Sequence, residues 1–203
     1  MAYAVDNAHR LKKDGLAVPF RQTPNGGGSM RPLYLIIHYT AGRDAESSIR
    51  WFENKDAQAS AHLVVGRDGS VTQLQRFDRL CWHAGKSRWG EIEGLNAHSI
   101  GIEIDNAGVL DKTDAGAWRS WFGDTIPPEQ VLVAQHRLGG PSRGWHVYTP
   151  EQIEIVMSIA TALHARYAFL DILGHDDISW PRETDPGPAF PLSSLRSRVL
   201  GRA

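Results

Sequence analysis

This chain of 203 residues is poor in sulfur and has no long apolar run. Cys81 is the only cysteine, which excludes an internal disulfide and a metal site built from several thiolates. No stretch approaches the roughly 20 apolar residues of a membrane span. The first ten residues lack the basic segment and apolar segment of a signal peptide. We therefore expect no membrane partner and a protein that is cytoplasmic as synthesised.

The chain also lacks an excess of charge of either sign. Lys and Arg number 22 and Asp and Glu number 23, for a formal net charge of −1. Without a global field we expect no nucleic-acid partner, and a substrate must be recognised locally. The length suits one domain with a sizeable core and is short for two.

Short apolar runs predict strands, and longer periodic runs predict helices. Thr149, Pro150 and Gln152 form a capping box ahead of a periodic apolar segment, which marks the start of a helix. Strands interleaved with helices indicate a single α/β domain with a central mixed β-sheet flanked by helices. The expected strands are residues 33–39, a hairpin over 63–73, 99–105 and 170–174, and the other expected helices are 44–54 and 191–200.

Two regions lie outside this pattern. Residues 1–31 are mostly polar and end near a Gly-rich breaker cluster, so we interpret them as an N-terminal arm ahead of a domain over residues 32–203. Residues 106–148 are rich in Trp, Gly and Pro and lack clear periodicity. We expect them to form a long irregular insertion that could line a site.

Two polar clusters could carry chemistry. His38 ends a buried apolar run, where an imidazole needs a partner, and taken alone it favours a structural hydrogen bond. His175 lies in a proline-stiffened loop with Asp176, Asp177 and Asp185, any of which could pair with it. Two histidines and one carboxylate would leave the fourth position of a tetrahedral zinc open for water, which is the catalytic arrangement. The other histidines without a sequence partner are interpreted as surface or packing residues: His9, His98, His136, His146 and His164.

Several segments in a fixed order carry a family resemblance. They are Ile36-Ile-His-Tyr-Thr40, Ser60-Ala-His62 followed by Arg67-Asp-Gly69, Trp82-His-Ala-Gly85, Ser99-Ile-Gly-Ile-Glu103, and Gly174-His175 through Thr184-Asp-Pro-Gly-Pro-Ala-Phe190. From Leu33 to Arg196 the chain resembles the type-2 N-acetylmuramoyl-L-alanine amidases, whose superfamily includes phage lysozyme-type amidases and peptidoglycan recognition proteins. The resemblance implies hydrolysis of the amide between N-acetylmuramic acid and L-alanine, in peptidoglycan or in soluble muropeptides.

The resemblance also implies which residues do the work. It assigns Zn²⁺ to His38, His175 and Asp185 in a surface groove, and it makes Glu103 the acid/base residue. Amide hydrolysis needs an activated water, a stabilised oxyanion and a proton for the leaving amine. Zinc would supply the first two. A carboxylate within reach of the water can take its proton and pass it on.

Other residues match positions that line the groove in relatives. His62 and His83 could contact substrate or could orient the metal ligands from behind. Trp82, like Trp89, would suit stacking on sugar faces, although core packing is the commoner role of a tryptophan. Cys81 has no family match as a nucleophile, and we interpret it as a small buried hydrophobe.

One position departs from the family pattern. Many bacterial relatives carry a lysine two residues before the aspartate ligand, where it stabilises the developing oxyanion. Here that position is Glu183, preceded by Arg182. A carboxylate would repel an oxyanion. We expect Arg182, which we place among the substrate-binding residues, or a groove histidine to stabilise the oxyanion instead, or activity to be weak.

Two other functions are alternatives to an amidase. A peptidoglycan-binding module or sensor of the same fold usually loses a zinc ligand, whereas all three are present here. A metallopeptidase of other substrates lacks support, since the chain has no helical histidine-glutamate motif. We expect a monomeric amidase, either a phage lysin released to the cell wall or a cytoplasmic enzyme that trims recycled muropeptides.

Overall fold

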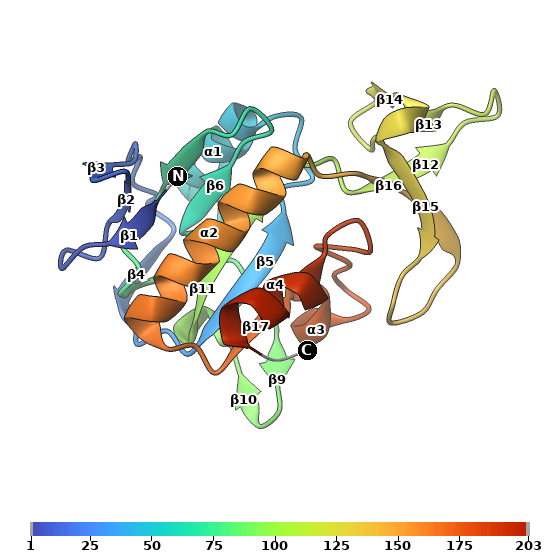
Figure 1. Ribbon diagram of the computed structural model, residues 1–203. Helices are drawn as coiled ribbons and strands as arrows, with labels where there is room; N and C mark the ends of the chain where they lie inside the picture. The colour runs from blue at the N-terminus through green and yellow to red at the C-terminus, as the bar shows by residue number, and fades with distance from the viewer. Residues whose placement is uncertain (1, 202–203) are drawn as a thin grey trace.

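A mixed five-stranded sheet forms the centre of the computed structural model, which describes residues 2–201 (Figure 1). The strand order is β17-β5-β11-β6-β7. The first four strands run parallel and β7 runs antiparallel to β6, which confirms the expected mixed α/β sheet. The strands are β17 (Asp171–Gly174), β5 (Tyr34–Tyr39), β11 (Ser99–Ile104), β6 (Leu63–Val65) and β7 (Val71–Gln73).

Helix α2 (Pro150–Tyr167) crosses one face of this sheet (Figure 1). It begins at the predicted capping box, in which Thr149 and Gln152 bond each other's backbone N–H. Its buried side chains pack on those of β5 and β11, including Leu35, Ile37 and Ile102, to form the main core. Helix α4 (Leu192–Leu200) lies beside α2. These contacts leave the other face of the sheet for the site.

That other face carries two smaller apolar clusters. Helix α1 (Ala45–Glu53), capped by Asp44, packs Ile49 and Phe52 against β6. Ile36 and Leu173 of β5 and β17 pack on α3 (His175–Ser179) and on η2 (Leu95–Ala97). Nearby lie η1 (Lys55–Ala57) and the hairpin of β9 (Arg88–Trp89) and β10 (Ile92–Glu93). No helix within residues 2–201 is long and apolar enough to cross a bilayer.

Residues 2–31 contribute side chains to the core of the domain. Leu11 and Val18 are buried in the main core. The strands of this region are β1 (Tyr3–Val5), β2 (Leu11–Lys13) and β3 (Leu16–Ala17), which form a small antiparallel sheet, and β4 (Gly26–Ser29), which pairs with β8 (Arg79–Cys81).

The prediction that residues 106–148 are irregular is wrong. They form a second, antiparallel sheet with its own small core around Ala107, Leu110 and Ile126. Its strands hold only two to five residues each, too few to show alternation in the sequence. The elements are β12 (Val109–Lys112), β13 (Trp118–Arg119), β14 (Thr125–Ile126), η3 (Pro128–Gln130), β15 (Val131–Gln135) and β16 (Ser142–His146).

Candidate active site

The parallel register brings three candidate residues to one edge of the sheet. Glu103 of β11 lies opposite His38 of β5, and Gly174 of β17 lies opposite Ile37. His175 therefore follows β17 at the level of His38. Since side chains alternate along a strand, His38, Glu103 and His175 share the face opposite α2. The carboxyl ends of parallel strands are where α/β proteins commonly place their ligands.

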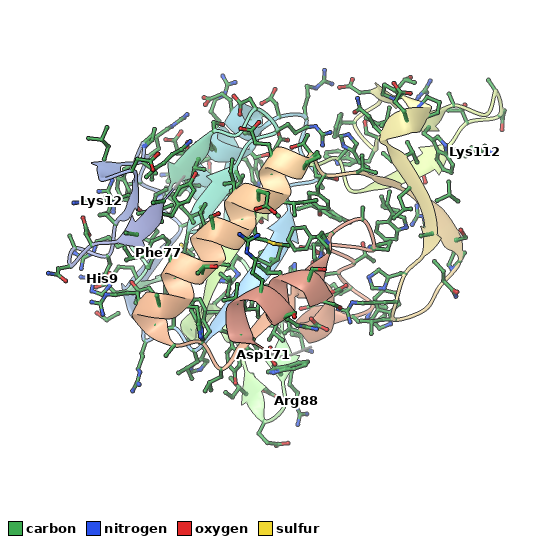
Figure 2. All side chains as sticks on the ribbon, viewed as in Figure 1. His9, Lys12, Phe77, Arg88, Lys112 and Asp171 are labelled. Atoms are coloured by element: carbon green, nitrogen blue, oxygen red, sulfur yellow. The ribbon has the colours of Figure 1, made fainter. Side chains whose placement is uncertain are left out.

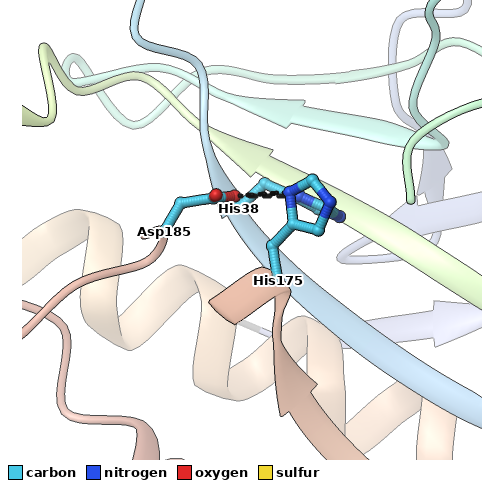
Figure 3. A group of neighbouring side chains, drawn as sticks. All are labelled: His38, His175 and Asp185. Atoms are coloured by element: carbon cyan, nitrogen blue, oxygen red, sulfur yellow. Dashed lines mark hydrogen bonds and ion pairs between the residues drawn. The ribbon is translucent and has the colours of Figure 1, made fainter. Parts of the chain in front are cut away.

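Asp185 completes a buried cluster with the two histidines (Figure 3). Its Oδ2 lies 3.0 Å from His38 Nδ1 and 3.2 Å from His175 Nδ1. Sequence spacing left Asp176 and Asp177 as alternatives, but both of these carboxylates face Arg137. The structure thus brings together the three residues that the family resemblance implied.

The hydrogen bonds around the cluster define which ring nitrogens carry hydrogen. His175 Nε2 lies 3.3 Å from the Ala84 carbonyl, and His83 Nε2 lies 3.2 Å from the Ser99 carbonyl. A carbonyl oxygen only accepts, so both Nε2 atoms donate. His83 Nδ1 is then an acceptor in the neutral ring, and it receives the hydrogen of His38 Nε2 at 3.0 Å.

When both rings are neutral, as metal binding requires, the Nδ1 atoms of His38 and His175 present lone pairs toward the Asp185 carboxylate. In that state the three groups are acceptors that lie within 4.8 Å of one another, and a cation would satisfy all three. Zinc takes such nitrogen and oxygen donors at about 2.0–2.2 Å in a tetrahedron, with neighbouring donors roughly 3.3 Å apart. The donor set therefore fits a zinc ion.

Burial and mutual charge shift the pKa of each cluster member. Burial, together with the neighbouring His175, lowers the pKa of His38 to about 4. Burial opposes charge on His175 as well, but its hydrogen bond to Asp185 outweighs this and raises its pKa. Burial would raise the pKa of Asp185, yet the bonds from both histidines hold it well below its usual range. Asp185 is thus a carboxylate, the form that binds metal.

Glu103 is a buried carboxyl with an unused oxygen. Its side chain is 8% exposed, and its Oε2 has no hydrogen-bond partner among residues 2–201. Burial, with the nearby charges of Asp185 and Glu183, raises its pKa well above the ordinary value. A carboxyl with a raised pKa in a cleft is suited to exchanging protons near neutral pH.

His62 and His83 support the cluster from behind. His62 is fully buried, accepts from the Gly101 N–H at 3.1 Å and donates to the Arg79 carbonyl at 2.9 Å. No ring nitrogen of His62 is left for a substrate, so of the two roles considered for it the geometry favours orientation. Gly101 is required here, because a Cβ would lie 2.5 Å from the His83 ring.

The aromatic and cysteine candidates separate by burial. Trp82 is 40% exposed, whereas Trp89 packs against the apolar cluster around Ile36. Cys81 is fully buried, and burial raises the pKa of its thiol to about 12. Its thiol therefore stays protonated and is not a nucleophile, which agrees with its interpretation as a small buried hydrophobe.

Arg182 and Glu183 lie at the rim of the site. Arg182 donates to the carbonyls of Ala84 at 3.2 Å and Lys86 at 3.0 Å, and to Ser179 Oγ at 2.9 Å, so it ties that loop to α3. It also pairs with Glu183. Glu183 still acts on the site, since its charge contributes to the raised pKa values of Glu103 and His175.

Sequence reasoning missed a polar clamp from the insertion, formed by His136 and Arg137. His136 Nε2 donates to Asp176 Oδ2 at 2.9 Å, and Arg137 reaches Asp176 at 2.6 Å and Asp177 at 2.7 Å. The Asp176 N–H in turn donates to the Asp185 carbonyl at 2.8 Å. The partners are about 40 residues apart in the chain and form no motif, so the sequence carries no signal for the clamp.

The fold and this cluster define an α/β protein with a buried site that could hold a metal. The chain belongs to the N-acetylmuramoyl-L-alanine amidase family, which it matches over residues 28–188. This finding confirms the resemblance carried by the sequence motifs.

Individual relatives agree with this assignment. The chain is 33% identical over 213 residues to the 1,6-anhydro-N-acetylmuramyl-L-alanine amidase AmpD of Enterobacter cloacae, covering 93% of this chain and 95% of AmpD. It is 30% identical to the N-acetylmuramoyl-L-alanine amidase AmiD of Escherichia coli, of whose length it spans about half (53%). A solved complex of E. coli AmiD with the substrate anhydro-N-acetylmuramic acid-L-Ala-D-γ-Glu-L-Lys superposes with a TM-score of 0.64 at 30% identity, covering 95% of this chain and 65% of that chain.

Proposed function

We propose that the protein is a zinc-dependent amidase that hydrolyses the bond between N-acetylmuramic acid and L-alanine in peptidoglycan or muropeptides. The observation that carries the proposal is the close approach of three ligand atoms, on His38, His175 and Asp185, beside the Oε2 atom of Glu103, which has no hydrogen-bond partner among residues 2–201. The names of AmpD and AmiD describe amidases of this class, which supports the choice of reaction.

The residues divide the chemistry as follows. His38, His175 and Asp185 hold the zinc, which when bound supplies a Lewis acid for the carbonyl and lowers the pKa of water. Glu103 takes the proton of the attacking water and returns it to the leaving amine. His83 fixes the tautomer of His38 through their hydrogen bond. His62 packs edge-on against His83, with a distance of 5.7 Å between the ring centroids, and orients it from behind.

Substrate is bound around this cluster. Trp82 offers an exposed ring for an apolar contact. Arg182 fixes the loop of residues 84–86 through hydrogen bonds, and its half-exposed guanidinium is accessible to a substrate. The substrate is a soluble muropeptide or intact peptidoglycan, and the protein acts as a monomer.

The test combines metal content with product analysis. Purified protein should hold about one zinc per chain, and mass spectrometry should show release of stem peptide from anhydro-muropeptide that chelator abolishes. Glu103→Gln should keep its zinc but lose about 10²- to 10⁴-fold in turnover, the usual value of a positioned acid/base. Exposed Glu129→Gln serves as the matched control. Substrate binding without cleavage by zinc-loaded protein would instead indicate a sensor, and near-normal turnover by Glu103→Gln would remove that residue from the mechanism.

A further inference from the structure

A pocket of about 510 Å³ opens from Glu103 toward helix α1 and the insertion. Its lining includes Glu103, Thr40, the two tryptophans Trp51 and Trp121, and one cation, Arg43. Trp51 is 55% exposed and Trp121 is 72% exposed, although both are large apolar side chains. Exposed aromatic rings that border a catalytic carboxyl call for an explanation, because rings of this size are normally covered.

Contacts of residues 121–124 hold the Trp121 side of the pocket in place. Trp121 Nε1 donates to the Ala41 carbonyl at 2.6 Å, and its ring meets that of Phe122 at a centroid distance of 5.8 Å. Arg43 lies 5.6 Å from the Phe122 ring centroid and 3.6 Å from Asp124, so its charge is engaged at the rim. Trp121 and Phe122 thus form a prearranged apolar surface, and Arg43, the one cation in the lining of the pocket, is paired with Asp124.

The charges on the two sides of the cluster differ. In the order β17-β5-β11, this aromatic pocket lies on the Glu103 side of His38. On the His175 side a second pocket is lined by Lys86, Arg88 and Arg182, with Glu93 as its one carboxylate. Arg88 lies at the lower end of the molecule, on the β9–β10 hairpin, far from Lys112 of the insertion (Figure 2).

An amidase substrate has the same asymmetry. The stem peptide carries free carboxylates, as D-γ-Glu does, whereas the sugar is neutral and presents C–H faces and hydroxyls. Carboxylates suit this second pocket, in which three cations outnumber one carboxylate, better than the aromatic pocket, whose single cation Arg43 is paired with Asp124. The aromatic pocket offers flat apolar faces, together with the hydroxyls of Thr40, Ser47 and Ser48.

We infer that the pocket between α1 and the insertion is a saccharide subsite, in which Trp51 and Trp121 stack on neutral N-acetylated sugar units of the substrate. This inference rests on the proposed function. It places the glycan on the Glu103 side of the metal cluster and the stem peptide on the His175 side, and it makes the insertion a determinant of substrate choice.

The experiment measures binding by calorimetry with two probes, the neutral disaccharide N,N′-diacetylchitobiose and the tripeptide L-Ala-D-γ-Glu-L-Lys. Trp51→Ala and Trp121→Ala should each weaken disaccharide binding about tenfold and leave tripeptide binding unchanged. Trp121→Phe loses the bond to Ala41 but keeps an aromatic face, so it should retain most of the affinity. Leu132→Ala, an exposed apolar residue of the same insertion, is the matched control.

The outcomes separate the subsite from the reaction. Disaccharide binding that is equal in wild type, Trp51→Ala and Trp121→Ala, or a loss confined to the tripeptide, would overturn the subsite. Trp51 is exposed on a helix surface, so its alanine variant carries the test even if Trp121→Ala does not fold. If the alanine variants lose the disaccharide binding that wild type shows, but wild type cleaves no muropeptide, the subsite is upheld and the amidase function is refuted.

Discussion

At the scale of single residues, Glu183 is the most informative departure from the family pattern. Its charge, with burial and Asp185, raises the pKa of Glu103. Glu183→Gln removes that charge, so the pKa of Glu103 should fall. A base acts when deprotonated, so the acidic limb of the profile of kcat/KM against pH should move to lower pH. Glu183→Lys should move it further and raise the turnover number, since a cation there favours the oxyanion.

The control for this prediction is Glu129→Gln, which alters an exposed carboxylate on the insertion. Profiles of wild type and Glu183→Gln that superpose at low pH would mean that the charge of Glu183 is neutralised by Arg182, its ion-pair partner.

The ligand residues show how far sequence could go at this scale. His38 is a candidate because it ends a buried apolar run, and His175 because it lies in a proline-stiffened segment with three aspartates. Spacing could not choose among Asp176, Asp177 and Asp185, because the choice depends on where the loop after α3 folds back. In the structure Arg137 occupies the first two carboxylates and leaves Asp185 to the histidines.

At the scale of elements, the clamp couples the insertion to the metal-binding loop. Arg137→Ala removes the ion pairs to Asp176 and Asp177, which lie in α3 next to His175. The Asp176 N–H in turn bonds the Asp185 carbonyl. Loss of a partner behind a ligand commonly costs 10- to 100-fold in metal affinity, so we expect zinc affinity to fall by about that factor. Competition with a chromogenic chelator measures it.

Arg143→Ala is the matched control, because Arg143 pairs with Asp111 on the exposed surface of the same insertion. An Arg137→Ala protein that binds zinc as tightly as wild type would show that the loop holds its shape without the clamp.

The elements themselves were predictable where their patterns were long. Helix α2 and the central strands β5 and β11 follow from capping and from apolar runs. The sheet of the insertion did not, because its strands are short and half exposed, and tertiary pairing rather than local pattern defines them.

At the scale of the whole molecule, buried neutral histidines make stability depend on pH. Burial lowers the pKa of His62 to about 4, and burial with the charge of Arg67 does the same for His146. Below about pH 6.5 the unfolded chain binds protons that the folded chain refuses. The free energy of unfolding should therefore decrease as the pH falls from about 6.5 to 4.

Denaturant unfolding at pH 7.5 and pH 5.0 measures this decrease. His146 lies away from the metal cluster, where it accepts from the Ala107 N–H. His146→Gln should lose less stability between the two pH values than wild type does. An equal loss in both proteins would assign the pH dependence to other groups.

The insertion leaves and rejoins the domain at one place. Val109 of β12 pairs with Trp145 of β16, and Asn106 Nδ2 donates to the His146 carbonyl at 2.9 Å. The length of the excursion between these points is therefore independent of the spacing of β5, β11 and β17. Changes of length between Val109 and Trp145 therefore need not move the strands that carry His38 and Glu103. The residues of this segment that would contact substrate can vary separately from those that carry the reaction, except where His136, Arg137 and Trp121 connect the two.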